Sequence, residues 1–379
     1  MELVLSEDQE LIAKTARDFF GDKAPLSRTR ELRDAAGAAG FSEPLWAEMA
    51  ELGWVGIPFP ESVGGGGLGY AEMVLVMEAA GRSLVPEPFL ATILAGETIA
   101  QGGDDAQKAQ WLTPLVAGKA ILALAFEEKG SRFRRDHCAT LAESAGSGWR
   151  LSGEKIAVLD GHVADAFVVL ARTAGEVDDA EGMGLFLVPA DAKGVARERQ
   201  SRVDSRGAAM VFLDGVEVGP EALIGSATAG GALLDAALDR ATIALCGEML
   251  GSMEQAMEMT LTYMKEREQF GVRIGSFQAL KHRTARLFID IELSRSSVMA
   301  ASRALDEGDS EARALVSLAK AQCSEAAMNV ANESVQIYGG VGMTDEYDIG
   351  FFLKRARAAE LTFGDASFHR ARWAQLAGY

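Results

Sequence analysis

Hydrophobic positions repeat with a helical period at both ends of the chain and alternate with polar positions in its middle. Near the start, Ser6 and Gln9 have the spacing of a capping box, and apolar residues follow at helical spacing, namely Leu11, Ile12, Ala16 and Phe19. After about residue 229 the helical period returns over long segments, such as Ala232 to Arg267 and Glu311 to Tyr338. Both ends of the chain are therefore predicted to be helical.

The middle of the chain has the period of strands. Short apolar or alternating runs, separated by Gly, Asp and Pro turns, occupy 149–153, 166–171, 184–188 and 210–213. They predict a small β-domain. The order helical, β, helical predicts an α+β chain that is mostly α, with an N-terminal helical domain over 1–119, a central β-domain over 120–225 and a C-terminal helical domain over 226–379.

Size and charge limit the classes of function. With 379 residues, of which 48% are hydrophobic, the chain can bury a large core and should divide into two or three domains. Its net charge of −18 would repel phosphate backbones and anionic lipid, so we expect neither nucleic acid nor a membrane as a partner. The same charge would repel a CoA thioester at long range, so any CoA site needs local cations.

The cysteines and the N-terminus indicate the compartment. Cys138, Cys246 and Cys323 are few and widely spaced, which favours a reducing compartment without a disulfide framework or a metal cluster. Glu2, Glu7, Asp8 and Glu10 are acidic and no apolar h-region follows, so the segment near Met1 resembles no signal or transit peptide. No uninterrupted apolar stretch reaches the roughly 18–20 residues of a membrane span. We therefore expect a soluble, cytoplasmic protein.

Four consecutive glycines, Gly64 to Gly67, could suggest a phosphate-binding loop. No Lys-Ser or Lys-Thr follows them, and no strand and helix of the P-loop type flank them. We interpret the run as a turn before a helix over Tyr70 to Gly81.

One C-terminal segment carries a cation suited to a pyrophosphate. Arg267 begins the sequence R-E-Q-F-G, and Gln278 lies seven residues after its last glycine. A guanidinium holds a pyrophosphate by paired, charge-assisted hydrogen bonds. Phe270 can pack beside an adenosine, and Gly271 is expected to end the preceding helix as a C′ glycine.

A second segment supplies a glycine turn. Residues 336–344 read Q-I-Y-G-G-V-G-M-T, and Gly339 and Gly340 would let backbone amides approach an anion. The sequence T-F-G-D follows at 362–365. Together with R-E-Q-F-G and the P-E-S-V-G-G wording near residue 60, these motifs resemble the acyl-CoA dehydrogenases, and the resemblance covers essentially the whole chain.

The resemblance implies an enzyme that desaturates an acyl-CoA thioester between Cα and Cβ, with FAD as cofactor and an electron-transfer flavoprotein as acceptor. It also implies the family's fold, with a C-terminal four-helix-bundle domain. In the family, both motifs reach across a dimer interface to the flavin of a neighbouring subunit, so an oligomer is expected. The cofactor-binding residues implied here are Arg267, Phe270, Gln278, Gln336, Gly339 and Gly340.

The β-domain departs from the family at the flavin ring. Family members carry T-E-P-x-x-G-S-D and K-x-W-I-T-N-G segments whose Thr and Trp line the isoalloxazine, and here these segments correspond to 126–132 and 155–161. Ala157 replaces the Trp and Leu159 the following Thr, so neither offers an aromatic face or a hydroxyl. Glu127, at a Thr position, would place negative charge near a ring that becomes anionic on reduction. Either the chain does not hold a flavin ring itself, or its backbone supplies these contacts.

The family's usual base is also missing. A glutamate, usually in an E-G-T triplet, removes the α-proton, and its position here is Phe363. Some members take the glutamate from a mid-chain helix, at a position that aligns with Asp239; this shorter side chain is either the base or a helix-surface carboxylate. Arg240 matches an arginine beside the family's active site, or it is an i, i+4 partner on its helix. Asp365 is a further candidate, and His369, without a nucleophile motif or ligand spacing, indicates a surface or packing role.

Residues 339–355, which read G-G-V-G-M-T-D-E-Y-D-I-G-F-F-L-K-R, occur here with T-F-G-D-A at 362–366 and without the Trp-Ile-Thr segment. This combination resembles the smaller subunits of two-component bacterial acyl-CoA dehydrogenases, which are associated with pimeloyl-type or steroid side-chain thioesters. Such subunits pair with a related chain in a heterotetramer with fewer flavins than subunits. We therefore expect a subunit for lipid or steroid catabolism that contributes half of a shared flavin site and has an impaired substrate site. Two alternatives stay open: a self-sufficient homo-oligomeric acyl-CoA dehydrogenase with Asp239 as base, and a non-catalytic structural subunit. The sequence does not identify the acyl group.

Overall fold

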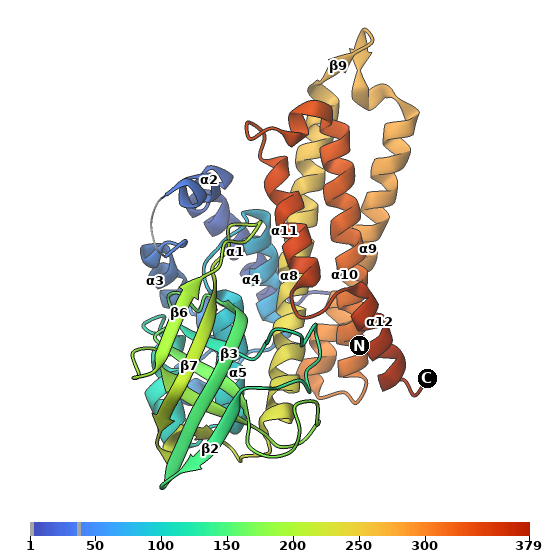
Figure 1. The fold of residues 1–379 in the computed structure, drawn as a ribbon. Coiled ribbons are helices and arrows are strands. Elements are labelled where there is room, and N and C mark those ends of the chain that lie inside the picture. Colours follow the sequence, from blue (N-terminus) through green and yellow to red (C-terminus); the bar gives the residue numbers. More distant parts are fainter. Residues whose placement is uncertain (1–3, 36–38) are drawn as a thin grey trace. The chain divides into compact units, whose positions relative to one another are not determined.

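The computed structural model describes residues 4–35 and 39–379, in which helices come first, then strands, then long helices (Figure 1). The α-helices are α1 (Glu7–Lys23), α2 (Leu26–Asp34), α3 (Glu43–Glu51), α4 (Tyr70–Arg82), α5 (Phe89–Gly102), α6 (Asp105–Gln107), α7 (Thr113–Val116), α8 (Gly230–Glu266), α9 (Gln278–Glu307), α10 (Ala312–Tyr338), α11 (Ile349–Leu361) and α12 (Ala366–Leu376). The strands are β1 (Leu122–Ala125), β2 (Leu141–Ala145), β3 (Gly148–Leu159), β4 (Ala166–Arg172), β5 (Met183–Pro189), β6 (Val195–Arg199), β7 (Ala208–Val218), β8 (Leu223–Ile224), β9 (Glu268–Gln269) and β10 (Val272–Arg273).

Internal contacts divide the chain into two compact units. One, here called the helical unit, comprises Met1–Glu31, Gly69–Val85 and Thr242–Tyr379; the other, here called the β-unit, comprises Leu32–Leu68 and Pro86–Ala241. Each unit is described by itself below.

The β-unit is built on an eight-stranded sheet. Its strand order is β6-β7-β3-β2-β4-β5-β8, with β1 paired to β4 in parallel, whereas β3 with β7 and β4 with β5 are antiparallel. β4 is buried along its whole length and β5 along nearly all of it, which explains why both appear as apolar runs rather than as alternating ones. The core on this sheet includes Phe167, Phe186 and Val211. The strands predicted from alternation and apolar runs, β3, β4, β5 and β7, are therefore confirmed.

A buried ion pair fixes the middle of β3. The Lys155 ammonium donates to Glu128 Oε1 at 2.6 Å, and the same carboxylate accepts from the amides of Ala139 at 2.6 Å and Thr140 at 3.0 Å. Lys155 is 0% exposed and Glu128 is 4% exposed. Burial alone would raise the pKa of Glu128, but the ammonium and the amide donors outweigh it and hold the pKa at about 2.

The helical unit is centred on α10. This helix packs against α9, α11 and α12, while α1 packs against α4 and α4 against α9. The later helices α9, α10 and α11 and most of α8 run alongside one another as a bundle (Figure 1). Two glycines let α4 and α8 touch, since a Cβ at Gly81 would lie 2.0 Å from the Glu248 carbonyl oxygen and one at Gly251 would lie 1.8 Å from that of Glu78.

The smaller sequence predictions can also be checked. The Ser6 and Gln9 capping box is present at the start of α1. The glycine run before α4 is a turn, as expected: the amides of Gly65, Gly66 and Gly67 donate to backbone carbonyls within the β-unit, at 2.9–3.1 Å, and are not arranged around a ligand. The three cysteines are buried free thiols. Among the described helices, none is long and apolar enough to cross a membrane.

Candidate functional site

A β-hairpin follows α8 and carries the first predicted cofactor residues. Arg267 comes directly after the helix, and its carbonyl accepts from the Ile274 amide at 2.8 Å across the base of the hairpin. Phe270 and Gly271 form the two-residue turn, with φ of 56° and 76°. The prediction that Gly271 ends the helix is wrong: α8 ends at Glu266, because two successive left-handed residues match the twist of a tight hairpin instead.

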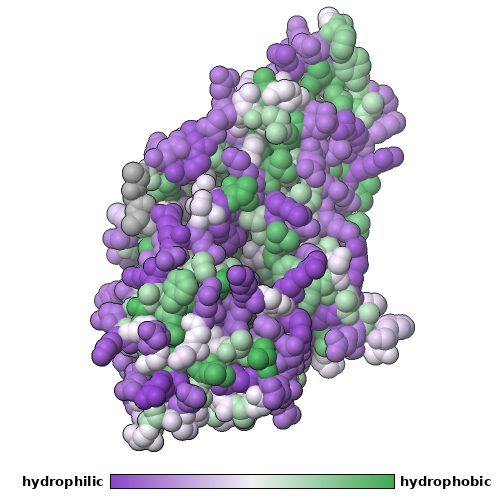
Figure 2. Space-filling view, viewed as in Figure 1, coloured by the Kyte–Doolittle hydropathy of each residue, from purple (hydrophilic) through white to green (hydrophobic). Residues whose placement is uncertain are grey.

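The tip of this hairpin is exposed. The Phe270 side chain is 92% exposed and meets the Phe277 ring edge-on, with 6.2 Å between centroids. Arg267 is exposed as well, and among the ion pairs of the described residues none involves it. Figure 2 shows hydrophobic residues among hydrophilic ones at this end of the bundle. A cation and an aromatic face are thus available to a ligand or a partner.

The predicted glycine turn lies at the end of α10. Gly339 caps the helix with φ 68° and begins a short 3-10 helix over Gly339–Met343. Gln336, Gly339 and Gly340 are all exposed. A Cβ added at either glycine would meet nothing within 4 Å, so the backbone here is open to close approach by a ligand.

Packing within the helical unit brings the hairpin and the glycine turn to the same end of the bundle. Met264, Ile274 and Ile337 form one apolar cluster, with Leu280 packed against it. The rings of Tyr263 and Tyr338 also stack, 4.1 Å apart at an interplanar angle of 11°. These contacts tie the last turns of α8 and α10 to the first turn of α9, where Gln278 lies and bonds His282 at 3.1 Å. The six predicted cofactor residues therefore share one exposed end of one unit (Figure 1).

The predicted flavin-ring segments lie in the β-unit, and two of their backbone amides are already hydrogen-bonded within it. The Ile156 amide donates to the Glu127 carbonyl at 2.8 Å, and the Ala157 amide donates to Gln200 Oε1 at 2.9 Å. Ala157 has φ 53° at a shift in the pairing of β3 with β7, and Leu159 pairs with Ala208. These two amides are therefore not available to replace the flavin-ring contacts of the missing Trp and Thr.

The Glu127 carboxyl is affected by its burial. Desolvation raises its pKa from 4.5 to about 7, although Arg202 acts in the opposite direction. Near neutral pH, a substantial fraction of this carboxyl is protonated. The expectation from the sequence that Glu127 carries a fixed negative charge is thus only partly correct.

The candidate base Asp239 lies on the first turns of α8, in the β-unit. It is 2% exposed, and its carboxylate meets Arg135 Nη1 at 3.4 Å, while the same guanidinium atom bonds Asp235 at 2.9 Å. Arg240 faces a different carboxylate, Glu97, at 3.3 Å. Asp239 is therefore a buried carboxylate paired with Arg135 rather than a helix-surface one.

The other candidates lie between α11 and α12 in the helical unit. Phe363 is buried at φ 63°, and Gly364 follows it at φ 116°. Asp365 is the N-cap of α12 and accepts from the Phe368 amide at 2.8 Å. His369 is 0% exposed, so it has a packing environment, and its Nε2 lies 3.1 Å from the Phe363 carbonyl oxygen.

Sequence reasoning missed Lys320, which is fully buried beside this turn. A signal was available, because the lysine falls on the apolar face of α10, in helical register with Val316 and Cys323. Arg135, the partner of Asp239, lies in the irregular segment between β1 and β2, and no periodicity indicates its contact.

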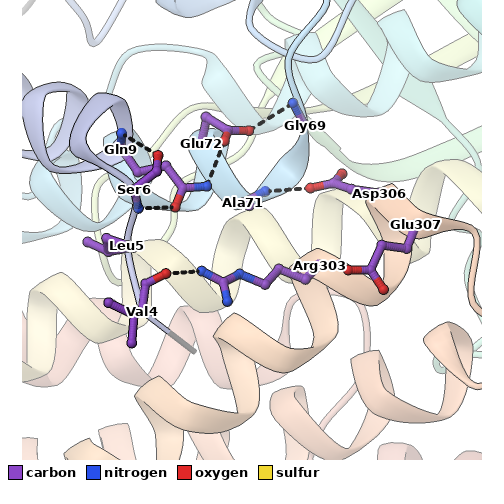
Figure 3. Close-up of a pocket in the computed structure, with 10 residues that line it drawn as sticks. All are labelled: Val4, Leu5, Ser6, Gln9, Gly69, Ala71, Glu72, Arg303, Asp306 and Glu307. Carbon is purple, nitrogen blue, oxygen red and sulfur yellow. Dashed lines mark hydrogen bonds between the residues drawn. The ribbon is translucent and has the colours of Figure 1, made fainter. Parts of the chain in front are cut away.

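A cleft elsewhere in the helical unit is drawn in Figure 3. Asp306 caps the start of α4 by accepting from the Tyr70 and Ala71 amides at 2.7 and 2.9 Å, and Arg303 donates to the Val4 carbonyl at 2.7 Å. These polar groups fasten α4 and the N-terminal segment to α9. The cleft thus serves packing between these elements.

The helical, β, helical order is the one that the resemblance to the flavin-dependent acyl-CoA dehydrogenases implies, and comparison with known proteins tests that class. Residues 6–119, 122–216 and 229–377 match, in turn, the N-terminal, middle and C-terminal domains of the acyl-CoA dehydrogenases. The chain belongs to this family, FAD-dependent oxidoreductases that act on the CH–CH group of acyl-CoA thioesters. The family and fold predicted from the sequence are confirmed.

Individual relatives extend over nearly the whole chain. The acyl-CoA dehydrogenase FadE12 of Mycobacterium tuberculosis is 31% identical over 372 residues, which cover 94% of this chain and 92% of FadE12. A chain of the solved ChsE4-ChsE5 complex from Mycobacterium tuberculosis is 28% identical to this one, with a TM-score of 0.90. The match covers 100% of this chain and 100% of that chain. A chain of a variant of the steroid ACAD Tcur3481-Tcur3483 is 32% identical to this one, with a TM-score of 0.87. The match covers 98% of this chain and 98% of that chain.

Proposed function

We propose that this chain is a subunit of a two-component acyl-CoA dehydrogenase. It lends the exposed end of its helical unit to an FAD held mainly by a related partner chain, and its own substrate site is impaired. The observation that carries the proposal is Phe270, a large apolar side chain that is 92% exposed in a left-handed turn next to Arg267.

Such a residue is costly in an isolated chain. A left-handed conformation costs roughly 1–2 kcal/mol for a residue with a Cβ, and an exposed ring keeps its apolar surface in water. Strain of this kind is typically kept where it serves a function. A dinucleotide fits the surroundings, because the Arg267 guanidinium suits the pyrophosphate, the uncrowded backbone at Gly339 and Gly340 leaves room for a phosphate, and the Phe270 ring suits the adenosine. The Gly339 amide itself donates to carbonyls at the end of α10, so the sequence-based expectation that it would bind an anion does not hold for this amide.

The residues at the ring end fit FAD less well. Ala157 and Leu159 carry no aromatic face or hydroxyl, and the amides of Ile156 and Ala157 already donate to Glu127 and Gln200. A chain that kept one half of the cofactor site and lost the other half would retain activity only beside a partner with a complete ring half. This contrast supports a shared site over an independent one.

The substrate side supports the same proposal. When bound, FAD accepts the hydride from Cβ, and a base must remove the α-proton. Phe363 cannot act as a base, Asp365 caps a helix, and Asp239 is held by Arg135. In this proposal the base that acts belongs to the partner.

Heteromeric relatives point in the same direction. The ChsE4-ChsE5 complex and the Tcur3481-Tcur3483 steroid ACAD each combine two named components. By analogy we propose a heterotetramer, a steroid or pimeloyl-type side-chain thioester as substrate and an electron-transfer flavoprotein as acceptor.

The proposal is tested by reconstitution with a related acyl-CoA dehydrogenase subunit. The complex should contain fewer flavins than chains and should bleach on adding an acyl-CoA, and Asp239→Asn in this chain should change the bleaching rate less than about threefold. A much larger loss, with flavin still bound, would establish Asp239 as the base of a self-sufficient enzyme. If Arg267→Ala left the flavin content and the activity of the complex unchanged, the remaining explanation would be a non-catalytic structural subunit.

A further inference from the structure

Three backbone carbonyls around the Phe363–Gly364 turn are held by buried side chains. Lys320 Nζ donates to the carbonyls of Glu360 at 2.9 Å and Gly364 at 2.8 Å. His369 Nε2 bonds the Phe363 carbonyl at 3.1 Å, which requires the tautomer with hydrogen on Nε2. The donors come from α10 and α12, so three helices meet at this turn.

The turn has a conformation that would not persist without support. Phe363 is left-handed at φ 63°, and Gly364 at φ 116° is where side chains are rarely found. A Cβ at Gly364 would lie 2.3 Å from the Phe368 ring and 3.0 Å from His369 Nε2, so the turn is closely packed as well as strained. The direction in which side chain 363 leaves the backbone depends on this geometry.

The Lys320 ammonium uses all three of its protons. Its third bond goes to Ser324 Oγ at 3.0 Å, and the side chain is 0% exposed. An ammonium is costly to bury, and an apolar residue would pack the centre of α10 at lower cost. A demand for fixed geometry at the turn explains why the charge is kept here. The Glu360 carbonyl, at the negative end of the α11 dipole, favours a cation.

We propose that Lys320 is a positioning residue whose three hydrogen bonds hold the strained Phe363–Gly364 turn and thereby set the direction of side chain 363 in the acyl-CoA site. The proposal depends on the proposed function only in taking residue 363 as the side chain that faces the acyl group. A neutral amine has two protons and one lone pair, so it can keep both carbonyls only if Ser324 turns to donate to it, and the bonds to the carbonyls lose their charge assistance. The hold on the turn should therefore weaken when the ammonium loses its proton.

The surroundings place this loss in an accessible range. Burial lowers the pKa of Lys320 from 10.5 to about 8, and the groups that face it, Cys246 on α8, Cys323 on α10, Glu360 on α11 and Asp365 at the start of α12, offset this only in part. The hydrogen-exchange rate of the turn's amides should thus change with pH by more than the intrinsic exchange rate does, with a transition near pH 8.

The test is pulsed hydrogen exchange of the full chain, read out over residues 361–366 below and above pH 8. Lys320→Met should speed exchange there by about tenfold at the lower pH and abolish the transition. Lys354→Met, an exposed lysine on α11, is the matched control and should change neither. Helix α9 should exchange as in the unaltered chain.

Three results would overturn the proposal. In the first, hydrogen exchange over residues 361–366 of the unaltered chain shows no transition near pH 8; this result is informative even if Lys320→Met fails to fold. The Met variant could leave 361–366 unchanged. It could also speed exchange equally through α9, α10 and α12, which would make Lys320 general support for the bundle. None of these readouts involves flavin or a partner chain, so this proposal and the shared flavin site can fail separately.

Discussion

The exposed end of the helical unit and the bulged middle of β3 are the two regions that the proposed function compares as halves of a flavin site, and they use their polar groups differently. At the first, Arg267, Gly339 and Gly340 face outward with room around them. At the second, the Ala157 amide is bonded to Gln200, and the neighbouring Lys155 is paired with Glu128 in the interior. The first region keeps the Arg267 guanidinium and the space beside two glycines available to a ligand, although the Gly339 amide donates within α10, and the second uses the Ala157 amide and Lys155 for its own fold. The proposed division of the flavin site between two chains rests on this difference.

The largest expected effect is on the β3 region. Lys155→Met leaves the Glu128 carboxylate buried without its cation, which should lower the free energy of unfolding by about 3–5 kcal/mol. Chemical denaturation monitored by circular dichroism measures this loss. Glu154→Gln, on the exposed face of the same strand, is the control and should stay within about 0.5 kcal/mol.

The double variant Glu128→Gln with Lys155→Met should recover part of that stability, because it removes the uncompensated charge. No recovery would show that the pair does not act as described. In the unaltered chain, the folded-state pKa of Glu128 is below its usual 4.5, so its contribution to stability is complete above about pH 4.5 and is lost as the pH falls toward 2.

A smaller effect is expected at the exposed end. Arg267→Met removes charge-assisted hydrogen bonds worth about 1.5–3 kcal/mol, so FAD should bind the reconstituted complex roughly 10- to 100-fold more weakly. Equilibrium titration of the apo-complex, followed by flavin fluorescence, gives this ratio. Arg273→Met, an exposed arginine two residues beyond the hairpin turn, is the matched control, and equal losses in both variants would reduce the effect to general charge.

The smallest expected effect concerns Glu127. Because its folded-state pKa of about 7 lies above 4.5, the folded chain binds more protons than the unfolded chain between these values, and stability falls as the pH rises through that window. Glu127→Gln should remove this dependence and stabilise the chain by about 1–2 kcal/mol above pH 7, after allowance for partial exposure. If the free energies of unfolding of the unaltered chain and of Glu127→Gln changed with pH in the same way, Glu127 would not be desolvated.

Much of the fold follows from hydrophobic period. The long helices α8 and α10 and the strands β4 and β5 were predictable because each buries a continuous face or run. Strands β2 and β6 were missed, since they expose most of their residues and carry no apolar alternation. The hairpin after α8 was mistaken for a helix end because strands of two residues are too short to show a period.

For the site, the sequence proposes residues but does not give their environment. Motif spacing identified Arg267, Phe270 and the glycine turn, but only tertiary packing shows that the Tyr263 and Tyr338 stack joins them at one end. Similarly, Asp239 was identified as a candidate base, and its pairing with Arg135 from a distant loop could not be inferred from local sequence. Long-range ion pairs leave no periodic signal along the chain.

The central claim is that this chain holds half of a flavin site, and the visible absorption spectrum of the chain purified by itself tests it most directly. The account predicts little flavin and little desaturation of acyl-CoA by the isolated chain, with both appearing when a related subunit is added. A homo-oligomer with a full complement of flavin that bleaches with an acyl-CoA would contradict it.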